Sequence, residues 1–407
     1  MKLKLNDLAI FGGNPTFDKK LHVGRPNIGD HKKLLERIED ALNRRWLTNN
    51  GPYVQEFEAR LSEIVGVEHV IVMNNATVAL EIVTRGMELS GEVIVPSFTF
   101  IATAHALQWQ GITPVFCDID PETHNIDPDK IEMLITPRTT GIIGVHVWGR
   151  PCDIDALQVI AQRHGLKIIF DAAHAFGCTY QGRMIGNFGE AEVFSFHATK
   201  FFNSFEGGAV ATNDDELAQK IRLMKNFGFA GIDNVIYIGT NGKMHEISAA
   251  MGLASLESLD TFLTINYRNY ERYREGLSGL PGIQLVQYDE FEKNNYQYVV
   301  AEVDETQTGI NRDNLNKILW AENVLARRYF YPGCHQAEPY SSYYPHAKFL
   351  LPETEKLVQR VLVLPNGTSV SPDEISTVCQ IIRFAVEHAG QIEPKLREVV
   401  VKTPTSF

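Results

Sequence analysis

Between residues 69 and 212, short runs rich in valine and isoleucine alternate with segments of helical pattern. The helical segments, such as "TVALEIVTRGMEL", repeat apolar residues at intervals of three and four. The runs between them are largely apolar, as is typical of strands buried on both faces: "HVIVM", "EVIVP", "TPVFCDI", "TGIIGVHVWG", "KIIFD", "AEVFSF" and "GAVAT". This alternation predicts an α/β fold in which helices cover both faces of a mostly parallel sheet. Ligands of such sheets bind at the carboxyl ends of the strands.

The pattern changes after residue 212. The segment 246–277 reads as one long helix that could bridge two domains. The last third then alternates strands ("YQYVVAEV", "VLVLP") with helices, as in a smaller α+β domain. We therefore expect an N-terminal segment (1–30), a large domain (31–270) and a small C-terminal domain (271–407).

Charge and composition argue against a nucleic-acid-binding, membrane-bound, secreted or metal-binding protein. The 407 residues are 44% hydrophobic and carry a net charge of −12 with no basic stripe, which disfavours binding to nucleic acid or to an anionic membrane. The opening "MKLKLNDLAIFGG" is too short and too interrupted for a signal peptide, and no apolar run reaches membrane-spanning length. The five cysteines lack CxxC spacing, so we expect reduced thiols, a cytoplasmic protein and no metal site.

One lysine, Lys200, stands in the apolar stretch "EVFSFHATKFFNSFEGGAV". An unpaired buried ammonium is costly, so this lysine either reaches water from a loop tip or takes part in chemistry. Asp171 follows a strand 29 residues earlier and is itself open to a second reading, as a turn former or helix N-cap. Both residues should lie at the carboxyl edge of neighbouring strands, facing one pocket.

A lysine and a carboxylate in one pocket fit pyridoxal 5′-phosphate (PLP). The amine bonds covalently to the aldehyde of PLP, and the carboxylate keeps its ring nitrogen protonated. Ala76 and Thr77 open a helix directly after a strand, where backbone N–H groups favour a phosphate. Phe100 could stack on the pyridine ring and Ser195 could bind the phosphate, although core packing and a backbone hydrogen bond are common alternatives for these two residues.

The chain resembles the sugar aminotransferases of the DegT/DnrJ/EryC1/StrS family along nearly its whole length. The blocks that carry the resemblance occur in family order: "WLTNNGPYVQEFE", "NATVAL", "EVIVPSFTFIAT", "PVFCDID", "DAAHAFG", "SFHATK", "FEGGAV" and "GTNGKMHE". Others, such as "YPGCHQAEPY", resemble the family members that aminate C4 of the sugar. The resemblance implies the type I fold of PLP-dependent transferases, which is that of aspartate aminotransferase, and homodimers with shared active sites.

The resemblance also implies roles for the cofactor residues. Lys200 would carry PLP, Asp171 would pair with its ring nitrogen, and Phe100 would cover the ring. His174 stands where the family has histidine or glutamine near the 3′-oxygen of PLP. The phosphate would be held by Ala76, Thr77 and Ser195.

Three further residues are expected to contact the partner subunit or the substrate. Asn241 in "GTNGK" would reach the phosphate in the partner subunit, while Arg327 and Lys243 would bind substrate. The chain departs from many relatives at two positions, since Phe205 replaces a glycine and Lys243 an arginine. A lysine keeps the charge of arginine but loses its fork geometry.

By this resemblance we expect transfer of an amino group from L-glutamate to a nucleotide-linked 4-keto-6-deoxy sugar. The expected acceptor is dTDP-4-keto-6-deoxy-D-glucose, with dTDP-4-amino-4,6-dideoxy-D-glucose as the product. Amination at C3 and a sugar dehydratase remain alternatives, although in the dehydratases a histidine replaces the lysine found here as Lys200. A non-catalytic PLP-binding regulatory protein is an alternative from another class.

Overall fold

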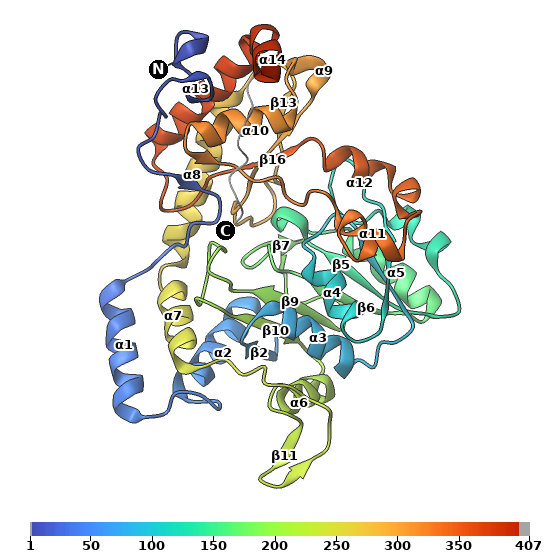
Figure 1. Cartoon of the computed structure of the whole chain (residues 1–407). Helices are drawn as coiled ribbons and strands as arrows, with labels where there is room; N and C mark the ends of the chain where they lie inside the picture. The colour runs from blue at the N-terminus through green and yellow to red at the C-terminus, as the bar shows by residue number, and fades with distance from the viewer. Residues whose placement is uncertain (1, 399–407) are drawn as a thin grey trace.

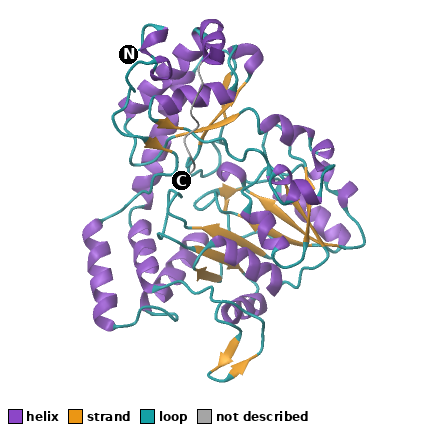
Figure 2. Ribbon diagram, in the orientation of Figure 1, coloured by secondary structure: helices purple, strands orange, loops and turns teal. Residues whose placement is uncertain are grey.

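The computed structural model describes residues 2–398, and its largest sheet has seven strands in the order β2-β10-β9-β6-β5-β3-β4 (Figures 1 and 2). Six strands run parallel, and β10 is antiparallel to both of its neighbours. The prediction of a mostly parallel sheet is confirmed. The strands are β2 (His69–Met73), β3 (Glu92–Pro96), β4 (Thr113–Cys117), β5 (Thr139–Val145), β6 (Lys167–Asp171), β9 (Ala191–Ser195) and β10 (Gly208–Thr212).

Helices cover both faces of this sheet, and each face has its own hydrophobic core. One face packs against α3 (Ala76–Gly86), α4 (Ala102–Gln108) and α6 (Asp215–Met224). The other packs against α2 (Pro52–Val65), α5 (Ile154–His164) and α7 (Glu246–Leu256). The sequence of α2 shows why it forms: Pro52 occupies its first position, Gly66 ends it at a φ of 76°, and its buried residues recur at helical spacing.

The C-terminal third of the chain contains a separate three-stranded antiparallel sheet, with the strand order β13-β14-β16. Its strands are β13 (Ile283–Leu285), β14 (Val299–Val303) and β16 (Val361–Leu364), and its main helices are α8 (Leu259–Leu277), α10 (Arg312–Ala321) and α13 (Pro372–Glu387). The N-terminal segment packs here too, because Leu8 and Leu21 belong to this core and β1 (Leu21–His22) pairs with β15 (Val324–Leu325). The division at residues 30 and 270 stays a prediction.

Two helices differ from the sequence-based expectation. The segment 246–277 forms α7 and α8 rather than one helix, and Ser258 marks the break by turning its hydroxyl back to the carbonyl of Ala254 at 3.2 Å. The helix expected near 128–135 is replaced by two short 3₁₀ turns, in which Ile131 is the buried residue that joins them.

Smaller elements complete the described chain. A hairpin of β11 (Phe229–Gly231) and β12 (Asn234–Val235) projects away from the body of the molecule (Figure 1). No helix within residues 2–398 is both long enough and apolar enough to span a membrane. The remaining α-helices and paired strands of the described residues are α1 (His31–Arg44), β7 (Thr179–Tyr180), β8 (Arg183–Met184), α9 (Glu305–Thr308), α11 (Tyr340–Tyr343), α12 (Pro352–Leu357) and α14 (Ala389–Glu398).

Candidate active site

A cavity of about 600 Å³ opens at the carboxyl ends of β6 and β9. This is the edge of the sheet at which the sequence predicts a ligand. Tyr298, which directly precedes β14, and the loop that follows β15 close the cavity from the other side. Its lining includes Asn75, Ala76, Thr77, Phe100, Asp171, His174, Ser195, His197, Lys200, Glu206, Tyr298, Tyr329 and Phe330.

Lys200 lies in a turn five residues beyond the end of β9, where its backbone N–H donates to the carbonyl of His197 at 2.8 Å. Its Nζ donates to the hydroxyl of Tyr298 at 3.3 Å. Burial disfavours the ammonium form and lowers the pKa of Lys200 to about 8, although the charge of Asp171 opposes the shift. The uncharged amine, which is the form that attacks an aldehyde, is therefore more abundant near neutral pH than in an ordinary lysine.

Asp171 is the last residue of β6 and is almost fully buried. One carboxylate oxygen accepts a hydrogen bond from the hydroxyl of Thr103 at 2.8 Å, and the other accepts from the N–H of Ala173 at 3.1 Å. Burial raises the pKa of Asp171, while these hydrogen bonds and the charge of Lys200 act in the opposite direction. A buried carboxylate of this kind gains from a cationic partner.

His174 lies in a stack of aromatic rings beside the cavity. Its ring is nearly parallel to those of Trp148 and Phe330, with centroids at 6.2 and 5.8 Å. Its Nδ1 accepts a hydrogen bond from the backbone N–H of Trp148 at 3.3 Å, so the proton of the neutral ring is on Nε2. Burial, and then the charge of Lys200, lower the pKa of His174 well below its usual value. The imidazole is thus neutral, with one donor.

The N-terminus of α3 forms one wall of the cavity. Asn75 caps the helix by accepting a hydrogen bond from the N–H of Val78 at 2.8 Å, and the N–H groups of Ala76 and Thr77 have no acceptor within the helix. A Cβ on Gly208 would come within 2.6 Å of the nitrogen of Ala76. The glycine at the start of β10 is what allows this helix end to lie so close to the sheet.

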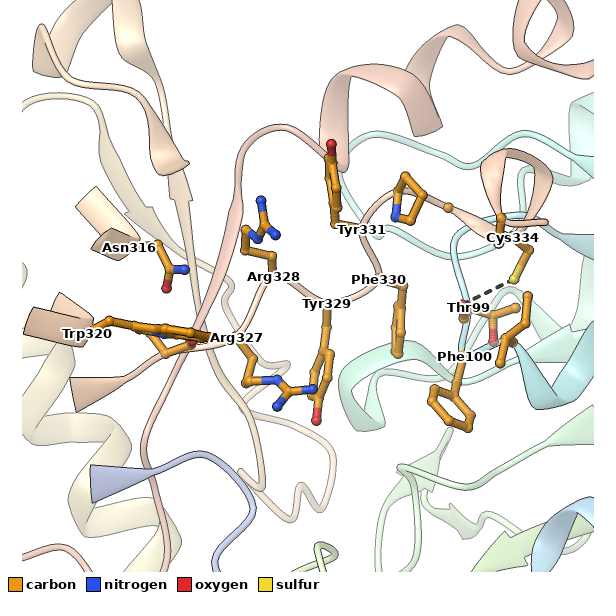
Figure 3. A pocket seen from close by; sticks show the side chains of 15 residues that line it. Thr99, Phe100, Asn316, Trp320, Arg327, Arg328, Tyr329, Phe330, Tyr331 and Cys334 are labelled. Atoms are coloured by element: carbon orange, nitrogen blue, oxygen red, sulfur yellow. Dashed lines mark hydrogen bonds between the residues drawn. The ribbon is translucent and has the colours of Figure 1, made fainter. Parts of the chain in front are cut away.

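A second pocket of about 770 Å³ adjoins the first. The two share a wall made of Phe100, Tyr329 and Phe330. Figure 3 shows the second pocket, with Arg327 extended along Tyr329 and with Trp320 at the far side. The Arg327 guanidinium lies 5.4 Å from the centre of the Tyr329 ring. We call the two spaces the inner cavity and the outer pocket.

The structure brings most of the predicted site residues to these two spaces. Phe100 is 57% exposed rather than packed in the core, and its side chain borders both spaces. Ser195 lies in the inner cavity at the end of β9. Asn241 and Lys243 border neither space in their own chain. Asn241 is exposed, and Lys243 lies over the ring of Phe227 at 4.6 Å.

Several residues of the site have no signal in the sequence. Thr103, Tyr298, Tyr329 and Phe330 contact the predicted groups or close the cavity over them. The three aromatic residues come from parts of the chain that lie 98 (298 − 200) to 130 (330 − 200) residues after Lys200, and only the folded chain places them there. Phe205, which replaces a family glycine, has a φ of 62°, the left-handed conformation that glycine adopts most readily.

The functional groups that line the inner cavity are suited to bind PLP. A reactive amine, a buried carboxyl group, a neutral imidazole and an open helix N-terminus surround one space of about 600 Å³. These groups match the aldehyde, ring nitrogen, 3′-oxygen and phosphate of the cofactor.

Comparison with known proteins agrees with the site. The sequence pattern of the DegT/DnrJ/EryC1/StrS aminotransferase family matches residues 29–383. The chain belongs to this family. The aminotransferase is 39% identical to the dTDP-4-amino-4,6-dideoxy-D-glucose transaminase of Shigella dysenteriae, over 90% of this chain and 99% of the relative. It is 32% identical to the GDP-perosamine synthase of Escherichia coli O157:H7, over 89% and 98% of the two chains.

A crystal structure of DesI in the presence of its TDP-sugar product is also similar to the aminotransferase. The TM-score is 0.93 and the sequences are 49% identical, with 97% of this chain and 100% of that chain covered. Family members depend on PLP, so this aminotransferase is a PLP enzyme and the expected cofactor is confirmed. The expected type I transferase fold is confirmed as well.

Proposed function

We propose that the aminotransferase transfers an amino group from L-glutamate to C4 of dTDP-4-keto-6-deoxy-D-glucose, which gives dTDP-4-amino-4,6-dideoxy-D-glucose. The observation that carries this proposal is the pair of adjoining spaces: the inner cavity holds the reactive lysine, and the outer pocket has room for a large substituent. The name of the Shigella relative and the TDP-sugar product in the DesI structure support the choice of acceptor.

In this proposal the outer pocket receives the nucleotide part of the acceptor. Arg327 and Arg328 supply positive charge at its edge, in a protein whose net charge is −12. The Trp320 ring offers an apolar face, and Asn316 beside it has a buried Oδ1 that accepts no hydrogen bond from residues 2–398 (Figure 3). Two guanidinium groups, an aromatic face and an amide suit a diphosphate and a base.

The residues of the inner cavity have different roles in the proposed reaction. PLP, when bound, supplies an electron sink that stabilises negative charge on the carbon losing a proton. The uncharged Nζ of Lys200 would take the proton from the α-carbon of the donor in the first half of the reaction and would deliver a proton to C4 of the sugar in the second half. Asp171 would stabilise positive charge on the ring nitrogen of the cofactor. The Nε2–H of His174 can donate a hydrogen bond, and the α3 N-terminus, together with Ser195, can hold the phosphate.

The acceptor is tested with a panel of dTDP-, UDP- and GDP-4-keto-6-deoxy sugars. We expect the dTDP-sugar to have the highest kcat/KM, and NMR of the product to show nitrogen at C4. A preference for the GDP-sugar would favour the activity named for the E. coli relative instead. Nitrogen at C3 would refute the regiochemistry while leaving the aminotransferase assignment in place.

We also propose a homodimer with shared active sites. The projecting hairpin has a strongly apolar surface, which is unusual for exposed chain and typical of an interface. Asn241 follows this hairpin and borders neither space of its own chain, as expected if it serves the partner. Lys243 would contact substrate from the same segment. The exposed apolar residues are Phe227, Phe229, Ile232, Val235, Ile236 and Ile238.

Mixing two inactive variants tests the shared site. If Asn241 binds the partner's cofactor, a dimer of one Asn241→Ala chain and one Lys200→Ala chain has one intact site and one site damaged twice. We therefore expect activity to return after subunit exchange. The test requires that Asn241→Ala alone loses roughly ten- to a hundredfold in cofactor affinity, as expected for a charged phosphate contact. No recovery from a mixture that does form mixed dimers would place Asn241 outside the shared site.

A cytoplasmic location is part of the proposal. The five cysteines carry free thiols and are buried. Reduced thiols are the rule in the cytoplasm.

A further inference from the structure

A hydrogen-bonded bridge of three side chains ties the loop 327–337 to the large sheet. His335 lies in the middle of this bridge and is buried. Its Nδ1 is 2.6 Å from the hydroxyl oxygen of Ser97, which directly follows β3. Its Nε2 is 2.5 Å from a carboxylate oxygen of Glu355 on α12. We call this set the Ser97–His335–Glu355 bridge.

Both ring nitrogens of His335 have a partner in the bridge. Nε2–H donates to Glu355, and Nδ1 accepts the Ser97 hydroxyl proton. The Ser97 oxygen in turn accepts from the backbone N–H of His335 at 3.2 Å. Gly333 leaves room for the ring, since a Cβ there would lie 3.1 Å from His335 Cε1.

Both ends of the bridge are fixed to the large sheet. The backbone of Ser97 donates to Cys117 at 3.1 Å and accepts from the N–H of Cys334 at 2.9 Å. At the other end, Asp118 accepts three hydrogen bonds from the start of α12, two of them from Thr354 at 2.8 Å. The loop is therefore held between two anchored points.

A Ser–His–Glu set is also the arrangement of some hydrolases. Ser97 is completely buried and borders neither the inner cavity nor the outer pocket, so it cannot meet a substrate. The bridge is not a nucleophilic site. Its role is to hold the loop 327–337 in place.

The bridge leads to both spaces of the active site. Cys334 donates through Sγ to the carbonyl of Thr99 at 3.3 Å, as the dashed line in Figure 3 shows. Thr99 lies 3.1 Å from the hydroxyl of Thr103, which donates to Asp171. Upstream in the loop, Phe330 stacks on Trp148 with ring centroids 5.3 Å apart.

We propose that His335 is a positioning residue for the acceptor. Through Ser97 and Glu355 it fixes the loop 327–337 in the conformation in which Arg327, Tyr329 and Phe330 border the outer pocket. The proposal rests on the proposed function to the extent that the sugar nucleotide occupies this pocket. L-Glutamate has no nucleotide part to place in the outer pocket, so we expect the donor half of the reaction to depend less on the loop.

The test measures the two half-reactions separately, by rapid mixing and the absorbance of the bound cofactor. In His335→Ala and Ser97→Ala we expect kcat/KM for dTDP-4-keto-6-deoxy-D-glucose to fall roughly ten- to a hundredfold, as small misplacements of binding groups do. The reaction with L-glutamate should stay close to the wild-type rate. Equal losses in both half-reactions, or no loss in the acceptor half, would overturn the proposal.

A conservative variant and a second readout separate positioning from simple destabilisation. Glu355→Gln keeps an oxygen that accepts from His335 Nε2, so it should retain most of the acceptor rate, while Glu355→Ala should not. Hydrogen exchange should rise in the peptides covering 327–337 in His335→Ala and remain unchanged in Glu355→Gln. Unchanged exchange in His335→Ala would refute the bridge even if no acceptor is turned over by the wild type. A wild-type enzyme that rejects every acceptor refutes only the proposed substrate.

Discussion

Lys200→Ala should abolish turnover and the covalent link between protein and cofactor. The Nζ of Lys200 is the amine of the inner cavity that can bond to the aldehyde, and it is also the group placed to move the proton. Reduction of the wild-type holoenzyme with borohydride, followed by mass spectrometry, should find the pyridoxyl group on the peptide that contains Lys200. The variant should carry no such adduct, although PLP can still bind non-covalently.

Another buried lysine provides the matched control. Lys225 is only 7% exposed and has a pKa lowered by burial, but it pairs with Glu58 outside the inner cavity. Lys225→Ala should keep the adduct on Lys200. An adduct on a different lysine in the wild type would contradict the assignment.

The pH dependence of cofactor attachment adds a measurement that needs no substrate. Because the pKa of Lys200 is lowered to about 8, the uncharged amine increases as the pH rises through that value. The rate at which the apo-protein attaches PLP should therefore rise around pH 8 and level off above it. A rise that continues to the ordinary lysine value of 10.5 would mean that burial does not activate this amine.

The positions of Lys200 and Asp171 were predictable because they depend on local order in the sequence. Each residue comes at or just after the end of an apolar strand, and the parallel strands β6 and β9 are neighbours in the sheet. Carboxyl ends of neighbouring parallel strands meet at one edge. The helix N-terminus at Ala76 follows β2 by the same rule, with Asn75 as its cap.

The antiparallel direction of β10 can be predicted from the short connection between β9 and β10. The link from β9 to β10 contains no helix, and a parallel neighbour would require a crossover connection. The antiparallel pairing follows from that fact and from the glycine pair at 207–208. This explains how one reversed strand enters an otherwise parallel sheet.

The aromatic wall and the bridge could not be derived from the sequence. Tyr298 and Phe330 reach the inner cavity from loops around a different sheet, and no local pattern relates either residue to Lys200. His335 looks like a loop histidine until Ser97, 238 residues earlier, is placed beside it. Contacts between residues so far apart in the sequence depend on how the large sheet packs against the C-terminal part of the chain. Hydrophobic periodicity does not specify that packing.

Asp171→Asn should leave the fold intact and slow the proton-transfer step by a large factor. The amide is nearly isosteric with the carboxyl group. Its oxygen can accept from the N–H of Ala173, and its NH₂ can donate to Thr103, whose hydroxyl then turns to Thr99 at 3.1 Å. What is lost is the negative charge opposite the ring nitrogen. At an effective dielectric near 20 that contact is worth on the order of 4 kcal/mol, so a loss of roughly a hundred- to a thousandfold is expected.

Stopped-flow measurement of the reaction with L-glutamate gives the rate, and Thr103→Val is the control. That variant removes one hydrogen bond from Asp171 but keeps its charge, so it should lose roughly tenfold at most. Near-normal turnover in Asp171→Asn would mean that another carboxylate pairs with the cofactor.

The thermal stability of the apo-protein provides a second test of Asp171→Asn. The substitution should lower the reaction rate without lowering the stability of the empty protein. Burial raises the pKa of Asp171, so ionising this group at neutral pH lowers the free energy of unfolding of the empty protein. The neutral amide of the variant carries no such cost. The apo form of Asp171→Asn should therefore unfold at the wild-type temperature or above it, while its gain in stability on binding PLP should be smaller than in the wild type. A variant that is less stable without cofactor and gains as much from it would show that Asp171 is structural, because only a charge held for the cofactor weakens the empty protein and strengthens the loaded one.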